Sequence, residues 1–373
     1  MKHILIFIES LSGGGAEKVL VTLLKHLDYS KYKVTLMPLV DTGVLKDDID
    51  FSKLNYTPVI REAKTPLQRL WNKIKYKLIY HYLPCRLTNR WIVPQKGIDV
   101  YIAFTEGFST KLISYTTKKK LAWVHADLKT DPWTLNQHIY SSLEEEKQAY
   151  QRFNKVICVS QLVEQVMREL YDLNQTKTIH NPIDADDILK KAKQPINIDI
   201  PSSFNIVSVG RLVPQKGFDR LIHAVGKLRH EGKNIQLFII GEGSERQKLE
   251  NIIKRDELQD TIHLVGFMKN PYPLMDKMDL FVCSSRAEGY SLVIAEAMIL
   301  GLPVISTNCA GPKELLDNGN YGMIVENHDE ALYEGINNII KKPSLLNTLK
   351  LKSKEGIKFL GLEKCLMAFE NLI

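Results

Sequence analysis

The sequence lacks the signatures of a disulfide-rich or zinc-binding protein. Its five cysteines are scattered, and no two of them form a C-x-x-C pair, so neither a disulfide framework nor a zinc site is indicated. Cys158 and Cys283 stand inside apolar runs, where cysteine behaves as an ordinary core residue. This usage is typical of a protein in a reducing compartment.

Long apolar runs and a secretory leader are also missing. No run of about 18 apolar residues occurs, which is the length that predicts a membrane-spanning helix. The short apolar opening meets three glycines and a charged stretch rather than a small-residue cleavage site. We therefore expect a cytoplasmic protein, and a basic region described below leaves open a peripheral position on the inner face of the membrane.

Excess charge of one sign is small. The formal net charge is +7, from 50 Lys and Arg residues against 43 Asp and Glu residues. Such a bias suits an anionic substrate or an anionic membrane surface equally well. Because no nucleic-acid-binding module is recognisable, we expect no nucleic-acid partner.

Short apolar runs alternate with amphipathic stretches along most of the chain. Fully apolar runs joined by helices indicate a mostly parallel sheet that is covered on both faces. The sequence predicts strands over residues 3–8, 34–40, 100–104, 120–124 and 155–159, and again over 205–209, 235–240, 262–265, 280–283 and 303–306. The fold class is therefore α/β, with one architecture that appears twice.

A polar, proline-bounded stretch follows His180-Asn181-Pro182 and separates the two halves. The sequence predicts an N-terminal Rossmann-like domain over residues 1–182 and a C-terminal one over 183–345. Residues 346–373 are predicted to form a helical tail. A length of 373 residues fits this division, at about 100–200 residues per domain.

Two cations follow the first strand of the second half. Arg211 and Lys216 lie between Gly210 and Gly217, at the carboxyl end of a predicted strand. Ligands of open α/β sheets bind beyond these ends. An arginine and a lysine there would neutralise a diphosphate, whereas the alternative is two solvated surface cations. The flanking glycines favour the ligand-binding interpretation.

Two glutamates follow the strand that ends at Cys283. Glu288 precedes Gly289, which permits a sharp turn, and the next residues begin a helix with free backbone amides. Glu296 lies further along that helix among apolar residues, where a carboxylate needs a reason. The alternatives are a helix-capping role for Glu288 and a surface position for Glu296. The residues predicted to begin the helix are Tyr290, Ser291 and Leu292.

The first half carries two weaker signals. Gly13-Gly14-Gly15 follows the first strand and opens a helix, which permits close approach to an anion. Neither a P-loop nor the dinucleotide spacing is present, so a plain tight turn is the alternative. His125 stands at another strand end, and a lone histidine is more often structural than catalytic.

These runs together resemble glycosyltransferase family 4, retaining enzymes with the GT-B fold. The resemblance spans nearly the whole chain, from Lys2 to about Glu326. Its most specific part is the pair of glutamates eight apart with the upstream arginine and lysine. It is carried by Gly13 to Glu17, Trp123-Val124-His125, Gly210 to Gly217, Glu288 to Glu296 and Gly311-Pro312-Lys313-Glu314.

The resemblance implies a fold and a set of roles. Two Rossmann-like domains would face each other across a cleft, the first binding the acceptor and the second the donor, with the tail crossing back to the first domain. Arg211 and Lys216 would hold the donor diphosphate, Glu288 would contact the donor sugar, and His125 would lie beside that sugar. The further donor-binding positions implied are Gly14, Gly15, Gly210, Gly266, Met268, Gly289, Tyr290, Ser291, Leu292 and Glu296.

The implied chemistry needs no cofactor, because the nucleotide sugar is itself a substrate. We expect a UDP-sugar, since UDP-sugars are common donors in this family. Retention without an obvious nucleophile suggests front-face attack, in which the leaving phosphate takes the proton of the acceptor and the protein supplies positioning and charge. No metal is expected, since two D-x-D motifs, at 48–50 and 184–186, lie in polar loops far from the signature residues.

The acceptor side carries a basic and aromatic stretch from Arg61 to Arg90 in which only Glu62 is acidic. It either faces anionic lipid or is a solvated helix face with a few core aromatics. If it faces lipid, the acceptor is a lipid-linked saccharide and the product a surface polysaccharide. Its members are Arg69, Trp71, Lys73, Lys75, Tyr76, Lys77, Tyr80, Tyr82, Arg86 and Arg90.

Two alternative functions share this fold. A nucleotide-sugar epimerase would not need the arginine, the lysine and the paired glutamates, and would isomerise the sugar without transferring it. A catalytically silent binding scaffold would keep the fold without turnover. The intact Arg211, Lys216, Glu288 and Glu296 argue against the scaffold.

Overall fold

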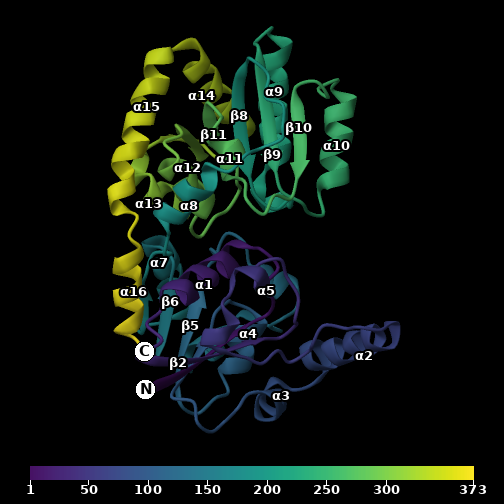
Figure 1. Ribbon diagram of the computed structural model, residues 1–373, viewed down its shortest axis with the longest axis vertical. Coiled ribbons are helices and arrows are strands. Elements are labelled where there is room, and N and C mark those ends of the chain that lie inside the picture. Colours follow the sequence, from purple (N-terminus) through teal and green to yellow (C-terminus); the bar gives the residue numbers. More distant parts are fainter. The chain divides into compact units, whose positions relative to one another are not determined.

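The computed structural model describes the whole chain, Met1–Ile373. The chain divides into two compact units. Unit 1 comprises Met1–Pro182 and Leu362–Ile373, and unit 2 comprises Ile183–Gly361. Each unit contains one parallel sheet with helices packed against it (Figure 1). The prediction of two Rossmann-like α/β domains is therefore confirmed.

The sheet of unit 1 has seven strands in the order β3-β2-β1-β4-β5-β6-β7. The chain runs outward from β1 to β3 and then returns to β4 on the other side of β1. This reversal makes the carboxyl ends of β1 and β4 a topological switch point, where α/β sheets bind ligands. The strands are β1 (Lys2–Ile8), β2 (Tyr32–Pro38), β3 (Asn55–Tyr56), β4 (Val100–Ala103), β5 (Lys119–Val124), β6 (Lys155–Cys158) and β7 (Thr176–Thr178).

The helices of unit 1 include one segment that stands apart from its core. Helix α2 has no buried residue, although it begins with a complete capping box formed by Thr65 and Gln68. It continues into the π-helix η3 (Leu78–Tyr82) and projects from the rest of the unit (Figure 1). The other helices are α1 (Gly15–His26), α3 (Cys85–Ile92), α4 (Phe108–Ile113), α5 (Trp133–Asn136), α6 (Leu143–Gln151), α7 (Gln161–Tyr171) and α16 (Leu362–Glu370), with α2 at Pro66–Lys77 and short 3-10 turns η1 (Lys46–Asp48) and η2 (Phe51–Lys53).

The sheet of unit 2 has six strands in the order β10-β9-β8-β11-β12-β13. The chain runs outward from β8 to β10 and returns at β11, so the switch point of this sheet lies at the carboxyl ends of β8 and β11. The strands are β8 (Phe204–Val209), β9 (Ile235–Ile240), β10 (Ile262–Gly266), β11 (Leu280–Cys283), β12 (Val304–Thr307) and β13 (Met323–Val325).

Both faces of this second sheet are buried. Ile206 and Val282 belong to one hydrophobic cluster, whereas the neighbouring Val207 and Phe281 belong to the other. Alternate residues of a strand point to opposite faces, so the apolar runs reflect burial on both sides. The helices are α8 (Ala185–Ala192), α9 (Phe218–His230), α10 (Arg246–Arg255), α11 (Tyr272–Met275), α12 (Leu292–Ile299), α13 (Ala310–Leu315), α14 (Asp329–Lys341) and α15 (Pro343–Gly356), with 3-10 turns η4 (Pro214–Lys216), η5 (Asp317–Gly319) and η6 (Ile357–Phe359).

The C-terminal tail is shared between the units. The sequence places the end of the second domain at residue 345, but in the structure unit 2 extends to Gly361. Helix α15 packs on this unit through buried Leu349 and Ser353. Only α16 joins unit 1, where the ring of Phe369 packs at 5.5 Å from that of Trp123.

The element boundaries follow the predicted ones closely in the apolar strands. The largest shift among them is in β2, which spans Tyr32–Pro38 where the sequence predicts 34–40. Strands β3, β7 and β13 were not anticipated. No helix combines the length and hydrophobicity needed to cross a bilayer.

Candidate active site

Two loops border the switch point of unit 2. The first follows β8 and carries Gly210, Arg211 and Lys216, and the second follows β11 and carries Ser284 to Glu288. Strands β8 and β11 are hydrogen-bonded neighbours, so their carboxyl ends lie side by side. The topology therefore brings the two predicted donor-binding segments to one edge.

Lys216 and Glu288 contact each other directly. The Lys216 Nζ lies 2.5 Å from Glu288 Oε1, and the Ser285 hydroxyl donates to the same oxygen at 2.7 Å. Glu288 is only 7% exposed. A cavity of about 10 Å³ beside the pair has room for one water molecule at most. Lys216 is therefore not the solvated surface cation of the alternative interpretation.

Two glycines allow this close packing. Gly217 has φ of 63°, and a Cβ there would lie 2.3 Å from the Ser284 carbonyl oxygen. Gly311, near the start of α13, donates its N–H to the Glu288 carbonyl at 3.1 Å. A Cβ on Gly311 would lie 2.5 Å from the Gly289 carbonyl oxygen. Only residues without a side chain fit at these two points.

The segment after Glu288 forms the start of a helix, as predicted. Ser291 occupies the N-cap position of α12, which begins at Leu292. Glu296 is 4% exposed and accepts a hydrogen bond of 3.1 Å from the Tyr272 hydroxyl. Burial and the nearby Glu296 carboxylate together raise the pKa of Tyr272. The surface alternative for Glu296 is therefore wrong, while its role toward ribose stays a prediction.

The remaining donor-side residues of unit 2 lie on neighbouring loops. Arg211 is exposed. The loop that carries it packs closely against the loop after β9: a Cβ on Gly241 of that loop would lie only 1.9 Å from the Gly210 carbonyl oxygen. Gly266 ends β10 with φ of 86°. Met268 packs on the core nearby.

The glycine loop of unit 1 carries a carboxylate that sequence reasoning did not weigh. Helix α1 begins at Gly15 and has Gly14 as its N-cap. A Cβ on Gly14 would lie 2.4 Å from the Glu17 carboxylate, so that carboxylate lies over the loop. An anionic phosphate would approach Gly14 and Gly15 only after the flexible Glu17 side chain had moved aside.

His125 is held in one neutral form. Its Nε2 lies 3.0 Å from the Phe104 carbonyl oxygen. Because a carbonyl only accepts, Nε2 carries the hydrogen and Nδ1 is the acceptor. Burial lowers the pKa of His125 to about 3, although the Phe104 carbonyl opposes the shift. The side chain suits acceptance of a hydroxyl hydrogen bond rather than donation of a proton.

Two further carboxyl groups border the switch point of unit 1. Glu9 follows β1 and accepts from the Phe108 N–H at 3.2 Å, and burial raises its pKa to about 7. Glu106 follows β4, is 6% exposed and accepts from the His125 N–H at 3.0 Å. Burial raises the pKa of Glu106 as well. Their positions directly after switch-point strands were the signal that sequence reasoning missed.

Comparison with known proteins decides the family. The family described as Glycosyltransferase Family 4 matches residues 13–187, and Glycosyl transferases group 1 matches residues 173–356. The two matches together span both units. The chain belongs to glycosyltransferase family 4.

Two relatives of this glycosyltransferase match it over nearly the whole of both chains. The chain is 28% identical over 96% of its length, and 95% of the relative, to a Campylobacter jejuni protein named N-acetylgalactosamine-N,N'-diacetylbacillosaminyl-diphospho-undecaprenol 4-alpha-N-acetylgalactosaminyltransferase. It is 24% identical, over all of both chains, to an uncharacterised Haemophilus influenzae glycosyltransferase. The crystal structure of Anabaena HepE with UDP-glucose matches 100% of this chain and 99% of its own, with a TM-score of 0.75 and 20% identity. This likeness supports the GT-B fold.

Proposed function

We propose that this glycosyltransferase moves a sugar, with retention of its anomeric configuration, from a UDP-sugar to a lipid-linked saccharide during synthesis of a bacterial surface glycan. The observation that carries the proposal is the contact between Lys216 and Glu288 at the switch point of unit 2. The contact brings a cation and a carboxylate close enough to bind the two parts of one glycosyl phosphate. The cation would bind the diphosphate, and the carboxylate would accept hydrogen bonds from the sugar hydroxyls.

The donor-binding step follows from the charges. Arg211 is exposed and Lys216 half-buried, so both can exchange water or a carboxylate for phosphate oxygens. Negative charge grows on the leaving phosphate as the glycosidic bond breaks, so a lysine at that oxygen stabilises the transition state more than the ground state. Glu288, freed from part of its contact with Lys216, accepts hydrogen bonds from the sugar.

Front-face attack is proposed as the route to retention, rather than a covalent intermediate, because Glu288 is poorly suited as a nucleophile. Its Oε1 is bound by Lys216 and Ser285, which lowers its reactivity. Front-face attack, with the leaving phosphate accepting the proton of the acceptor, needs no protein nucleophile. The neutral Nδ1 of His125 is available to accept a sugar hydroxyl. The alpha linkage in the name of the Campylobacter relative supports this outcome.

The donor and the absence of a metal requirement are part of the proposal. The HepE structures are complexes with UDP and with UDP-glucose, which supports a UDP-sugar here. No group of three or more His, Cys, Asp or Glu side chains is placed to hold a metal ion. Asp50 and Asp184, from the two D-x-D motifs, instead accept backbone N–H groups at the starts of η2 and α8.

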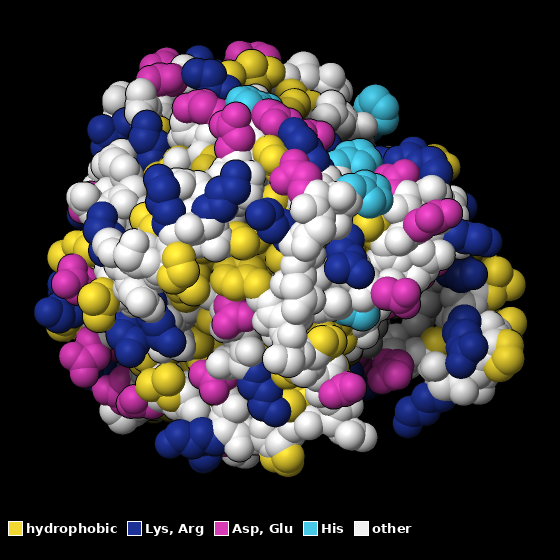
Figure 2. All heavy atoms as spheres, turned by 90° about the horizontal axis from the view of Figure 1, so that it is seen from above, with side chains coloured by type: hydrophobic (Ala, Val, Ile, Leu, Met, Phe, Trp, Pro, Cys, Tyr) yellow, Lys and Arg dark blue, Asp and Glu magenta, His cyan; other side chains and the backbone are white.

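The acceptor is proposed to lie on an anionic membrane that binds the arm formed by α2 and η3. Helix α2 has no buried residue, yet Leu67, Trp71 and Ile74 recur at helical spacing and are exposed. A helix of this length is marginal in water without a partner. Helix α2 lies at the far right of Figure 1, and at the right edge of Figure 2 Lys and Arg side chains lie beside hydrophobic ones. That combination suits the interface of an anionic bilayer.

Sugar transfer itself tests the proposed function. The protein is incubated with a panel of UDP-sugars and an undecaprenyl-diphosphate-linked saccharide, and the products are resolved by mass spectrometry and NMR. We expect an acceptor one sugar longer with an alpha linkage. An isomerised nucleotide sugar would support the epimerase, and no change in any donor would support the silent scaffold. A beta linkage would refute retention.

Binding to vesicles tests the membrane part separately. Replacing Lys73, Lys75 and Lys77 by Gln should weaken binding to phosphatidylglycerol vesicles, measured by sedimentation, by about 100-fold, at about 1 kcal/mol per surface lysine. The matched control replaces Lys350, Lys352 and Lys354, which have the same spacing on α15. Equal binding of both triple variants and the wild type would refute the membrane contact.

A further inference from the structure

We propose that the ion pair between Arg286 and Asp219 is a positioning device that fixes the separation of Lys216 and Glu288. This inference rests on the proposed function, because it assigns a role in sugar transfer to two residues that do not touch the substrate. It is carried by the contacts between the loop after β8 and the loop after β11.

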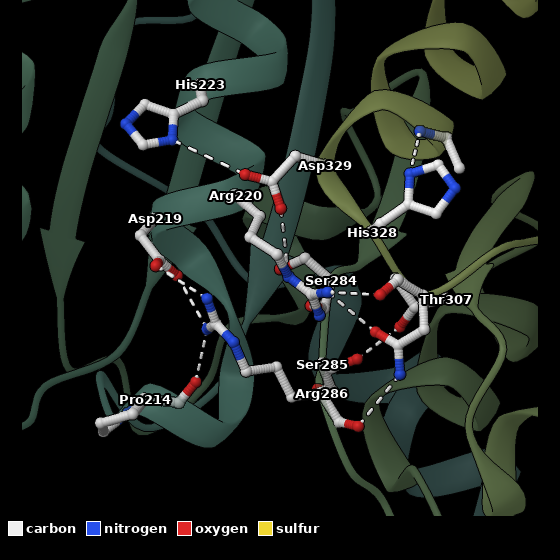
Figure 3. Close-up of polar contacts among 12 residues, drawn as sticks. Pro214, Asp219, Arg220, His223, Ser284, Ser285, Arg286, Thr307, His328 and Asp329 are labelled. Carbon is white, nitrogen blue, oxygen red and sulfur yellow. Dashed lines mark hydrogen bonds and ion pairs between the residues drawn. The ribbon is translucent and has the colours of Figure 1, made fainter.

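The guanidinium of Arg286 reaches from the second loop to the start of α9 (Figure 3). Its Nη1 and Nη2 donate to the two oxygens of Asp219 at 2.9 and 2.8 Å. Nη1 also donates to the Pro214 carbonyl at 2.7 Å. A forked contact of this kind fixes orientation as well as distance, which a lysine in the same place would not do.

The segment that carries Lys216 depends on these contacts for its position. It is the three-residue turn η4, which has no buried residue, so no hydrophobic side chain of η4 anchors it in the core. Polar contacts from the other loop hold it instead. The Arg286 N–H donates to the Gln215 carbonyl at 2.7 Å, and the Ser284 hydroxyl donates to the Lys216 carbonyl at 2.9 Å.

Arg220 and Asn327 hold the backbone around Arg286 in place. Buried Arg220 donates to the Ser284 carbonyl at 2.7 Å and to the Asn327 side-chain oxygen at 2.8 Å (Figure 3). The Asn327 amide in turn donates to the Arg286 carbonyl at 3.1 Å. The guanidinium of Arg286 is therefore presented from a fixed loop, and its side chain transmits that position to η4.

A simple stability role is a poor explanation for this arrangement. Arg286 is 41% and Asp219 22% exposed at the side chain. Most ion pairs that exposed add little to the stability of a fold, although a forked arginine–carboxylate pair adds more, and the melting temperature measures that contribution separately. The same helix provides a matched pair without any contact to the two loops. Lys227 of α9 binds Glu330 of α14 at 2.7 Å, with exposures of 47% and 55%.

The experiment uses the full chain and compares the two ion pairs. The variants are Arg286→Met, Arg286→Lys, Asp219→Asn and the double variant Asp219→Asn/Arg286→Met, with Lys227→Met and Glu330→Gln as controls. For each, kcat and KM are measured for release of UDP from the UDP-sugar that the wild type uses, together with Kd for UDP and the melting temperature.

A positioning role predicts a specific pattern. Arg286→Met and Asp219→Asn should each lower kcat by about tenfold or more, because displacement of a catalytic group by an ångström is costly. KM should change less than kcat, since the charge that Lys216 meets is greatest in the transition state. The double variant should be no worse than the worse single one. Arg286→Lys should fall in between, and the controls should match the wild type.

Three results would overturn the positioning role, and a fourth would refute the proposed function. Wild-type kcat in Arg286→Met and Arg286→Lys, or a kcat loss in the controls equal to theirs, would overturn the positioning role. Additive losses in the double variant would also overturn it. A wild-type protein that neither binds UDP nor releases it from any UDP-sugar would instead refute the proposed function, and this inference with it. Because Arg286→Lys keeps the charge, it covers the case in which Arg286→Met fails to fold.

Discussion

Replacing Gly311 by alanine should lower kcat in a protein that still folds. The added Cβ would lie 2.5 Å from the Gly289 carbonyl oxygen and 2.6 Å from the Tyr290 Cα. Both are backbone atoms of the segment that follows Glu288, so neither can be relieved by a side-chain rotation. Because real Cβ contacts essentially never fall below 3.0 Å, the segment or α13 must shift by about half an ångström or more.

The effects on stability and on kcat each have an expected size. Overpacking typically costs about 1–3 kcal/mol, while alanine is favoured over glycine in a helix by about 1 kcal/mol. The free energy of unfolding should therefore fall by about 2 kcal/mol or less. A displacement of Glu288 approaching an ångström should lower kcat for UDP release by about 10- to 100-fold.

The assay compares Gly311→Ala with Gly226→Ala in α9. A Cβ on Gly226 would approach the Leu258 Cδ1 to 2.8 Å, but that methyl group ends a flexible side chain and can turn away. The control should therefore keep the kcat of the wild type. A Gly311→Ala variant that is folded and equally active would refute the claim that this contact sets the position of Glu288.

Two more predictions concern metals and pH. Exhaustive treatment with EDTA should leave kcat unchanged, and activity that disappears and returns with added Mg²⁺ or Mn²⁺ would contradict the metal-free mechanism. Burial raises the pKa of Glu9 from 4.5 to about 7, so between these values the folded state holds a proton that the unfolded state has released. Stability should therefore fall as the pH rises through that window, by about 3 kcal/mol at most, and Glu9→Gln should flatten this part of the profile. Urea unfolding of both proteins at pH 5 and 7.5 measures the difference, and identical slopes would show that Glu9 is ionised throughout.

The strands that sequence reasoning predicted best are those buried on both faces. Residues 280–283 are wholly apolar and residues 235–240 are apolar except for Gln236, and the observed strands β11 and β9 have the same bounds. Strand β7 was missed because Thr176–Thr178 has no apolar run to reveal it.

The candidate site was predictable where chemistry and topology coincide. Lys216 and Glu288 are far apart in sequence but follow neighbouring strands, and the structure places them in contact. The sequence could not reveal which carboxylates are buried, since nothing in it distinguishes Glu9 and Glu106 from ordinary polar residues that follow strands. Nor could it show that Glu17 folds over Gly14, because that depends on the direction of a side chain.

The most direct test of the central claim is kcat/KM of Lys216→Ala and Glu288→Ala for release of UDP from the donor that the wild type uses, measured beside Lys227→Ala and with the melting temperature of each. If these two side chains form the donor site, each variant should lose about 100-fold or more, as when a single electrostatic contact to a transition state is removed, while it melts close to the wild type. Two folded variants that turn over the donor at the rate of Lys227→Ala would contradict the account.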